Sequence, residues 1–170
     1  RIGDAPREQL PAGERPLSGV RVLDLTRVIA GPVCGRTLAA HGADVMLISA
    51  EHLPAMVPYV IDTGRGKLSA SIDLRDAAGQ RSLTQLLEQA DVMIQGYRPG
   101  SLHDKGFGPH AAARIRPGIV YVSLSAYGGV GPWGSRRGFD SLVQTASGFN
   151  LAEAQAAGSD KPKVLPAQAL

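Results

Sequence analysis

The sequence predicts an α/β fold with a Rossmann-like, mostly parallel and doubly wound sheet. Three observations lead to this prediction: short apolar segments alternate with helical patterns, capping signals separate the two, and residues 20–48 read as one complete β–α–β unit. Parallel strands need long crossover connections, which helices normally supply. Regular alternation therefore favours a parallel sheet that is covered on both faces.

The unit at 20–48 begins with an apolar strand over 20–25. The pair Gly31-Pro32 then starts a helix, with Pro32 suited to the first helical position. A Gly-Ala-Asp turn at 42–44 leads into a second apolar strand. Open α/β sheets bind ligands just beyond the carboxyl ends of their strands, so the loop between the first strand and its helix is a candidate site.

The middle of the chain continues the alternation. Two prolines and a GRGK tract predict a loop over 49–68, and residues 69–74 alternate like a strand. Asp76 can cap the following helix. The spacing of apolar residues in that helix indicates one buried face, made of Leu83, Leu86, Leu87 and Ala90.

The second half of the chain predicts shorter elements. Residues 92–94 form a buried strand, 99–100 start a short helix or turn, 111–115 are helical, and 119–124 form a β-branched strand. Glycines make 128–134 a long loop. The last helix has an apolar face that comprises Phe139, Leu142, Val143 and Ala146 and continues to Phe149.

The composition is that of an ordinary soluble domain. Apolar residues make up 44% and charged residues 19%, and 170 residues are enough for one core. No apolar run approaches the about 18 residues of a transmembrane helix and no signal peptide is visible, so no membrane partner is expected. The single cysteine, Cys34, excludes an internal disulfide and fits a reducing, cytoplasmic location.

Charge and histidine spacing disfavour two further classes of function. The formal charge is +3, the basic residues are scattered and aromatic residues make up 5%, which disfavours nucleic-acid binding. The four histidines show neither metal-ligand spacing nor a paired Ser or Cys, so no metal site and no catalytic triad are expected. Scattered basic residues suit a small phosphorylated ligand.

The chain divides at residue 17. Residues 1–17 are rich in Pro, Gly and charge and are expected to form a linker or arm, whereas 18–170 form the folded part. The chain begins without Met and ends in an apolar, turn-like KVLPAQAL. We therefore expect it to be an incomplete fragment of a longer protein.

Four segments offer groups for an anionic ligand. A glycine lets a ligand approach the backbone N–H groups of 28–32, and Arg75 can pair with a phosphate. Tyr97 beside Arg98 can stack on a purine and contact a phosphate. Two adjacent arginines at 136–137 precede a helix and can hold a polyphosphate. Each segment also has a plain interpretation as an ordinary turn with an exposed charge.

A glycine motif at 129–134 matches the G-x-G-x-x-G pattern of dinucleotide sites. The motif follows a late strand instead of the first one, and it contains a proline where the helix should begin. A nucleotide-binding module of dehydrogenase type is therefore the weaker alternative.

Five motifs, in order, resemble CoA-transferase family III, the carnitine dehydratase/bile-acid-inducible type with formyl-CoA transferase and alpha-methylacyl-CoA racemase members. They are PLSGVRVLDLTRVIAGP (16–32), GADV (42–45), SIDLRDAAG (71–79), ADVMIQGYRPGSL (90–102) and GGVGPWGSRRGFDSLVQTASG (128–148). The resemblance covers about 16–170. It implies that 18–170 are the N-terminal part of the family's large domain.

The resemblance implies a set of contacts to coenzyme A. Ile29 and Ala30 match CoA-contact positions, and the segment 72–75 would lie along the adenosine part. Gly96 stands where the family usually has Asn, which removes one polar contact. The other matched or neighbouring positions are Ile72, Asp73, Leu74, Arg75, Tyr97, Arg98, Lys105 and Arg137.

The resemblance also implies the reaction. In the family an Asp attacks the thioester of an acyl-CoA, and that Asp would come directly after Leu170, so no catalytic residue is expected in this chain. CoA would move between an acyl-CoA and a carboxylic acid through an aspartyl anhydride and a thioester, without a metal or a redox cofactor. An interlocked homodimer is implied for the full-length protein.

Two alternatives stay within the family. The racemase branch has a basic His where this chain has Phe139, and Phe cannot move a proton, so an acyl-CoA racemase or epimerase would need another base. A non-catalytic CoA-transferase-like domain is the other alternative, since Gly96 and Ala50 depart from the family pattern.

We also expect this fragment to be inactive and to leave apolar faces partly exposed, including Leu83, Leu86, Leu87, Leu142, Val143 and Ala146.

Overall fold

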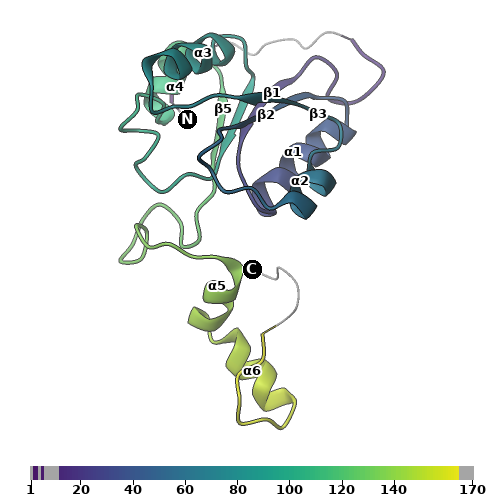
Figure 1. Cartoon of the computed structure of the whole chain (residues 1–170), viewed down its shortest axis with the longest axis vertical. Coiled ribbons are helices and arrows are strands. Elements are labelled where there is room, and N and C mark those ends of the chain that lie inside the picture. The colour runs from purple at the N-terminus through teal and green to yellow at the C-terminus, as the bar shows by residue number, and fades with distance from the viewer. Residues whose placement is uncertain (1, 4, 6–11, 165–170) are drawn as a thin grey trace. The chain divides into compact units, whose positions relative to one another are not determined.

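The structure is a computed structural model that describes residues 2, 3, 5 and 12–164. The chain divides into two compact units, residues 1–124 and residues 125–170, and each is described by itself. The first unit contains the sheet, and the second contains two short helices (Figure 1).

The first unit is built on a parallel sheet of five strands. The strands are β1 (Arg21–Leu25), β2 (Asp44–Ser49), β3 (Lys67–Ser71), β4 (Val92–Gln95) and β5 (Val120–Ser123). Their order across the sheet is β3-β2-β1-β4-β5, and every neighbouring pair is parallel. This arrangement confirms the predicted α/β, Rossmann-like and doubly wound fold.

Four helices connect the strands and cover both faces of the sheet. α1 (Ala30–Ala40) and α2 (Val57–Thr63) lie on one face, and α3 (Ala77–Leu87) and α4 (Pro109–Ile115) lie on the other (Figure 1). The chain winds outward from β1 to β3, returns to the centre at β4 and then winds the other way. The carboxyl ends of β1 and β4 therefore form the topological switch point, where open α/β sheets bind ligands.

The apolar face of α3 is packed within this chain. Leu83 and Leu87 have no exposed surface, Ala90 is buried and Leu86 is half-buried. The expectation that this face stays partly exposed is therefore wrong for Leu83 and Leu87. The surrounding strands and helices supply enough apolar surface to cover them, through a buried cluster that also includes Leu23, Leu25, Ile48, Leu74, Met93, Leu102, Phe107 and Ala112.

A second apolar cluster lies against α1. Leu17 packs on this cluster, and its N–H donates to the His41 carbonyl at 2.9 Å. The last residue of the predicted linker over 1–17 therefore contacts the folded unit, while residues 1, 4 and 6–11 lie outside the described residues. The buried members of the cluster are Val20, Val22, Ala39, Ala43, Val45 and Ile94.

The predicted loop over 49–68 is wrong in part, because it contains α2. Pro58 lies in the first turn of that helix, where a missing N–H is harmless. β3 begins and ends earlier than the predicted strand over 69–74, since its backbone pairs with β2 from Lys67 onward. The charge of Lys67 suggests a loop in the sequence, but in the fold that charge is paired with Asp24.

The other predicted elements of the first unit are confirmed with small shifts. The Asp76 carboxylate caps α3 by accepting the Gly79 N–H at 2.6 Å. Residues 99–100 lie in a turn. α1 begins at Ala30, so Pro32 is its third residue and not its first, which is still a position whose N–H has no partner within the helix.

The second unit contains two short helices, where the sequence predicts one long helix. α5 (Asp140–Ala146) and α6 (Phe149–Ala156) are separated by Gly148. The φ angle of Gly148 is 81°, in the left-handed region that favours glycine. The continuation of the apolar face to Phe149 within one helix is therefore wrong, because the chain changes direction before that residue.

The buried face of α5 is polar. The side chain of Gln144 has no exposed surface, whereas Phe139 and Leu142 are 68% and 55% exposed. Val143 is half-buried and Ala146 is exposed. The expected exposure of the 142–146 face is confirmed, and this chain leaves that apolar surface uncovered within its described part.

Candidate functional site

The switch point brings the loop after β1, which contains the predicted segment 28–32, next to the predicted segment 96–98. The guanidinium of Arg27 lies over the ring of Tyr97, 5.7 Å from its centroid, which is a cation–π geometry. The Tyr97 N–H donates to Oε1 of Gln95 at 2.8 Å, which fixes the backbone at the end of β4. The loops after β1 and β4 therefore form one surface.

Tyr97 offers an aromatic ring at this surface. The ring is half-buried, while Gly96 and Arg98 on either side of it are exposed. Burial raises the pKa of the Tyr97 phenol; Asp73 raises it further and Arg27 opposes the change. The phenol therefore stays neutral at physiological pH, and the ring can stack without carrying a charge.

The loop after β1 contains an unusual backbone conformation. Val28 has a φ of 74°, and among the described residues it is the one non-glycine residue with a positive φ. A β-branched residue in this region is an outlier that costs on the order of 1–3 kcal/mol and persists only where its surroundings fix the backbone. Ile29, half-buried, and Ala30, exposed, follow directly.

A buried carboxylate holds the start of this loop. Asp24 on β1 has no exposed surface, and its Oδ1 accepts the Thr26 N–H at 3.0 Å and the Thr26 hydroxyl. Nζ of Lys67 lies 2.7 Å from Asp24 Oδ2 and donates to the Pro32 carbonyl at 2.8 Å. A single ion pair thus joins β1, the start of β3, the loop and the first turn of α1.

α1 passes directly over this ion pair, which requires glycine at position 35. A Cβ at Gly35 would lie 2.5 Å from Oδ2 of Asp24 and 2.9 Å from Nζ of Lys67. We expect Gly35→Ala to lower the free energy of unfolding by about 1–3 kcal/mol, because α1 must move off a packed site. Urea unfolding measures the change. Alanine normally stabilises a helix interior relative to glycine, so a more stable variant would contradict the expectation.

The segment after β3 places an ion pair at the same edge of the sheet. Nε and Nη2 of Arg75 lie 2.9 Å and 2.5 Å from Oδ2 of Asp73, and Nδ1 of His52 lies 3.4 Å from that oxygen. The hydrogen bonds from Arg75 lower the pKa of Asp73 to about 2. Asp73 is therefore ionised throughout the physiological range, and a phosphate at Arg75 has to compete with it.

Ile72 and Leu74 of the same segment are packing residues. Leu74 is buried in the core and Ile72 packs against it. The Ile72 N–H donates to the Ser49 carbonyl at 2.7 Å, which extends the contact between β2 and β3 past the end of β3. These two side chains hold Asp73 and Arg75 at the surface.

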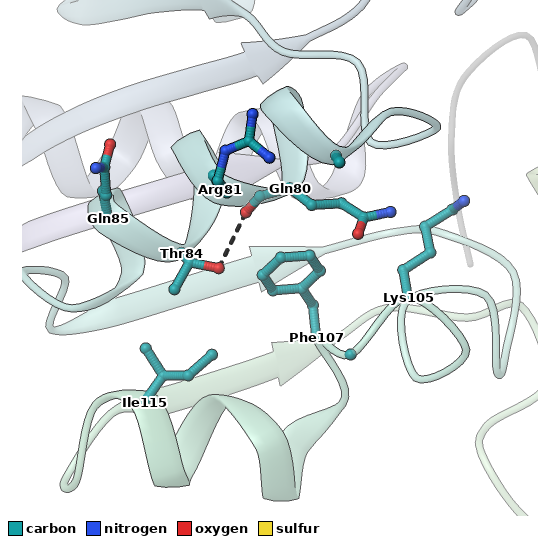
Figure 2. A pocket seen from close by; sticks show the side chains of 9 residues that line it. Gln80, Arg81, Thr84, Gln85, Lys105, Phe107 and Ile115 are labelled. Carbon is teal, nitrogen blue, oxygen red and sulfur yellow. Dashed lines mark hydrogen bonds between the residues drawn. The ribbon is translucent and has the colours of Figure 1, made fainter.

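Lys105 lines a groove between α3 and α4 (Figure 2). The groove has a volume of about 460 Å³ and includes the side chains of Phe107 and Ile115. Figure 2 shows the Lys105 ammonium extending away from Phe107. The lining contains none of the other predicted CoA contacts, so the structure groups Lys105 with this groove and not with the switch-point loops.

The second unit holds the remaining predicted basic site. The guanidinium of Arg136 lies 4.9 Å from the centroid of the Trp133 ring, and Trp133 packs edge-on against Tyr127. Arg137, the next residue in the chain after Arg136, is exposed. Phe139 is the residue before α5, and the segment 165–170 that precedes the expected Asp lies outside the described residues.

The glycine motif at 129–134 does not have the setting of a dinucleotide site. Such a motif follows the first strand and opens the first helix. Here it follows β5, an edge strand, and lies in turns before α5. The loop after β1, which would hold the motif in a dehydrogenase, contains the strained Val28 instead.

Reasoning from the sequence missed three side chains in and around this candidate site. Arg27 had a usable signal, since it lies two residues after a predicted strand. His52 had none, because its contact with Asp73 depends on the ends of β2 and β3 being neighbours. Lys67 was hidden in the GRGK tract, whose charges suggest an exposed loop.

The described part of the chain lacks both a membrane-spanning helix and a metal-binding cluster. None of its helices has the length and apolar character needed to cross a membrane. No three of its His, Cys, Asp and Glu side chains are grouped so that they could hold a metal ion.

Comparisons with known proteins agree on one family. The model of CoA-transferase family III matches residues 17–168. A probable fatty acyl-CoA transferase of Mycobacterium tuberculosis is 34% identical over 167 residues, which cover 91% of this chain and 42% of that protein. The human succinyl-CoA:glutarate CoA-transferase is 33% identical over 147 residues, which cover 79% of this chain and 34% of that protein.

Solved structures of similar proteins show the same fold. An orthorhombic crystal form of the M. tuberculosis protein matches with a TM-score of 0.82 and 35% identity, over 91% of this chain and 44% of that chain. A CAIB/BAIF family protein from Brucella suis matches with a TM-score of 0.73 and 30% identity, over 80% of this chain and 40% of that chain. This chain spans less than half the length of these relatives.

Proposed function

Because the chain belongs to CoA-transferase family III, we propose that the full-length protein moves CoA from an acyl-CoA to a carboxylic acid. The observation that carries the proposal is the placement of Arg27 over Tyr97 at the switch point of the sheet. A cation and an aromatic ring at this position suit the phosphates and the adenine of CoA. The relatives that are named CoA-transferases support the same activity.

We assign the nucleotide part of CoA to the carboxyl edge of the sheet. α1 has no side-chain cap at its start, so backbone N–H groups near Ile29 and Ala30 can donate to the ligand. The segment 72–75 borders the same edge with its Asp73–Arg75 pair, and the segment 96–98 adds Tyr97 and a second arginine. Arg137, in the second unit, stays a proposed phosphate ligand of the full-length protein, as the family resemblance implies.

The proposed reaction exchanges acyl groups between oxygen and sulfur. A carboxylate of an Asp directly after Leu170 attacks the thioester, the CoA thiolate leaves, and a mixed anhydride forms. The thiolate then attacks the aspartyl carbonyl and releases the donor acid, which gives an enzyme-CoA thioester. The acceptor carboxylate attacks that thioester, and the thiolate finally takes the acyl group from the second anhydride. No electrons are transferred, so no redox cofactor is needed, and no step of the proposed reaction uses a metal. As separate parts of the proposal, the full-length protein is cytoplasmic and forms an interlocked homodimer.

Calorimetry on the full-length protein tests this proposal against its alternatives. We expect binding of CoA and none of NAD, since the glycine motif at 129–134 lacks the setting of a dinucleotide site. Tight binding of NAD without binding of CoA would reject the transferase. Binding of CoA without any transfer between acyl-CoAs and acids would favour the non-catalytic domain.

The racemase alternative is disfavoured by Phe139. That residue is exposed just before α5, and its ring cannot accept a proton. The full-length protein should therefore leave the α-proton of a 2-methylacyl-CoA in place in deuterated water, as followed by mass spectrometry. Rapid deuterium incorporation would replace the transferase by a racemase with a different base.

We expect Arg137→Ala to weaken binding of CoA to the full-length protein by about 1.5–3 kcal/mol, the value of a charge-assisted hydrogen bond to phosphate. Pantetheine lacks the phosphates, so its affinity should stay unchanged. Calorimetry with both ligands gives the comparison, and Lys161→Ala, an exposed cation of the same unit, is the control. An equal loss for pantetheine would show that Arg137 is structural.

We expect Gly96→Asn to strengthen CoA binding by about 0.5–1.5 kcal/mol, because it adds a hydrogen-bonding group where the sequence lacks one. A Cβ at Gly96 would lie 3.9 Å from its nearest neighbours, the side-chain carbons of Thr26, which is an ordinary van der Waals distance. Gly129→Asn, at an exposed glycine with no positive φ and open space around it, is the matched control. Weaker binding after Gly96→Asn would mean that the ligand approaches the backbone there and needs glycine.

A further inference from the structure

The buried ion pair of Asp24 and Lys67 has no part in the proposed chemistry, yet its hydrogen bonds reach both the start of the loop after β1 and the first turn of α1. We infer that this pair positions the loop over 26–30 for the nucleotide part of CoA, so that Asp24 and Lys67 are positioning residues for ligand affinity. The inference rests on the proposed function, because it concerns the same ligand at the same edge of the sheet.

The contacts of the pair point to the loop. Both side chains are almost fully buried, with 0% of Asp24 and 1% of Lys67 exposed, so neither can touch a ligand. Oδ1 of Asp24 accepts two hydrogen bonds from Thr26, the first residue of the loop. Nζ of Lys67 donates to the carbonyl of Pro32, just beyond the other end of the loop. The pair therefore holds both ends of the segment.

The loop between these two anchors is the part of the edge that needs support. Val28 has a φ of 74°, which is unfavourable for a β-branched residue and requires contacts that hold the backbone. Arg27, which precedes Val28, has its guanidinium over the ring of Tyr97, so its charge lies at the switch point. If the anchors are lost, Val28 can relax to a negative φ, and Arg27 and the N–H groups that follow then change direction.

Packing alone does not explain an ion pair at this place. Apolar side chains of similar volume are often as stable as a buried ion pair, so stability gives little reason for the charges. A carboxylate that accepts from Thr26 and an ammonium that donates to Pro32 fix directions that apolar contacts would leave free. Gly31 and Gly35 leave room for this network, since a Cβ at either position would lie 2.4–2.5 Å from Thr26 or Asp24.

The test is a neutral double variant, Asp24→Asn with Lys67→Met, in the full-length protein. The matched control is Asp91→Asn with Arg116→Met, which removes a partly buried pair, 3.2 Å long, before β4 and after α4, at the opposite end of the strands. Thermal unfolding, the Kd of CoA and the KM and kcat of acyl-CoA transfer are measured for both. We expect the first variant to raise Kd and KM by about tenfold with kcat changed less than about threefold, and the control to lower Tm without a change in Kd.

Each outcome either supports or overturns the positioning role of Asp24 and Lys67. Unchanged CoA affinity in a folded Asp24→Asn, Lys67→Met variant overturns the positioning role, and so does an equal loss in the control. If the double variant shows no cooperative unfolding transition, Thr26→Val decides instead, because it keeps the ion pair and removes one link to the loop. Weaker CoA binding by Thr26→Val then supports the role, and unchanged binding overturns it. Absence of CoA binding by the parent protein rejects the proposed function itself, and the inference with it.

Discussion

Replacing Lys67 by methionine is expected to lower the free energy of unfolding by about 3–5 kcal/mol. The Asp24 carboxylate has no exposed surface, and the Lys67 ammonium 2.7 Å away supplies its counter-charge. Methionine keeps an unbranched apolar chain at that position but leaves an uncompensated charge inside the protein. The penalty comes from that desolvated charge, since the apolar contacts of the side chain are largely kept.

Urea unfolding of the full-length protein measures this effect. Adding Asp24→Asn to Lys67→Met should recover most of the loss, because the double variant contains no buried charge. Lys163→Met, at an exposed lysine of the second unit, should change the stability by less than about 0.5 kcal/mol. A Lys67→Met protein as stable as the parent would contradict the expectation, because it would show that Asp24 does not remain a buried charge without its partner.

Hydrophobic periodicity was sufficient to predict most of the first unit. The strands at β1, β2, β4 and β5 are short apolar runs, and α3 shows an amphipathic pattern with Asp76 as its cap. Such signals are local, because each strand and helix buries its own apolar residues against the sheet. The alternation of strands with crossover helices predicts parallel pairing, whereas the order of the strands is known only from the structure.

The incorrect sequence predictions have both local and long-range causes. Pro58 suggests a loop, yet it is tolerated in the first turn of α2. Lys67 suggests solvent, yet its charge is neutralised by Asp24, a residue far away in the sequence. In the second unit, the apolar pattern predicts one helix through Phe149. The chain instead turns at Gly148, whose positive φ is not apparent from the pattern.

The candidate site was predicted in its parts but not in its assembly. Tyr97 was singled out from its own sequence neighbours, whereas its partner Arg27 belongs to a loop about seventy residues earlier and becomes visible only when β1 and β4 lie side by side. Arg75 was predicted as a phosphate ligand, and the structure adds that Asp73 already occupies it. Sequence patterns identify which groups can bind, and the order of the strands determines which of them meet.

The chain of residues 1–170 alone is expected to show no CoA transfer, because the carboxylates at the ligand edge are unsuited to attack a thioester. Asp24 is buried and held by Lys67 and Thr26. Asp73 is held by Arg75, which lowers its pKa to about 2, and so acidic a carboxylate is a weak nucleophile. The carboxylate proposed to react lies beyond Leu170, outside this chain.

The same chain is also expected to unfold at a lower temperature than the full-length protein. Val57 and Ile61 on α2 are 64% and 66% exposed, and Phe139 is 68% exposed. At about 25 cal/mol per Å² of apolar surface, leaving a few hundred Å² in water forgoes several kcal/mol, which is comparable to the stability of a whole domain. Circular dichroism on heating measures the transition, and an acyl-CoA transfer assay with the full-length protein as positive control measures turnover. Turnover by residues 1–170 that is lost on Asp73→Asn would place the nucleophile at the ligand edge, and the proposed Asp after Leu170 would then have to be abandoned.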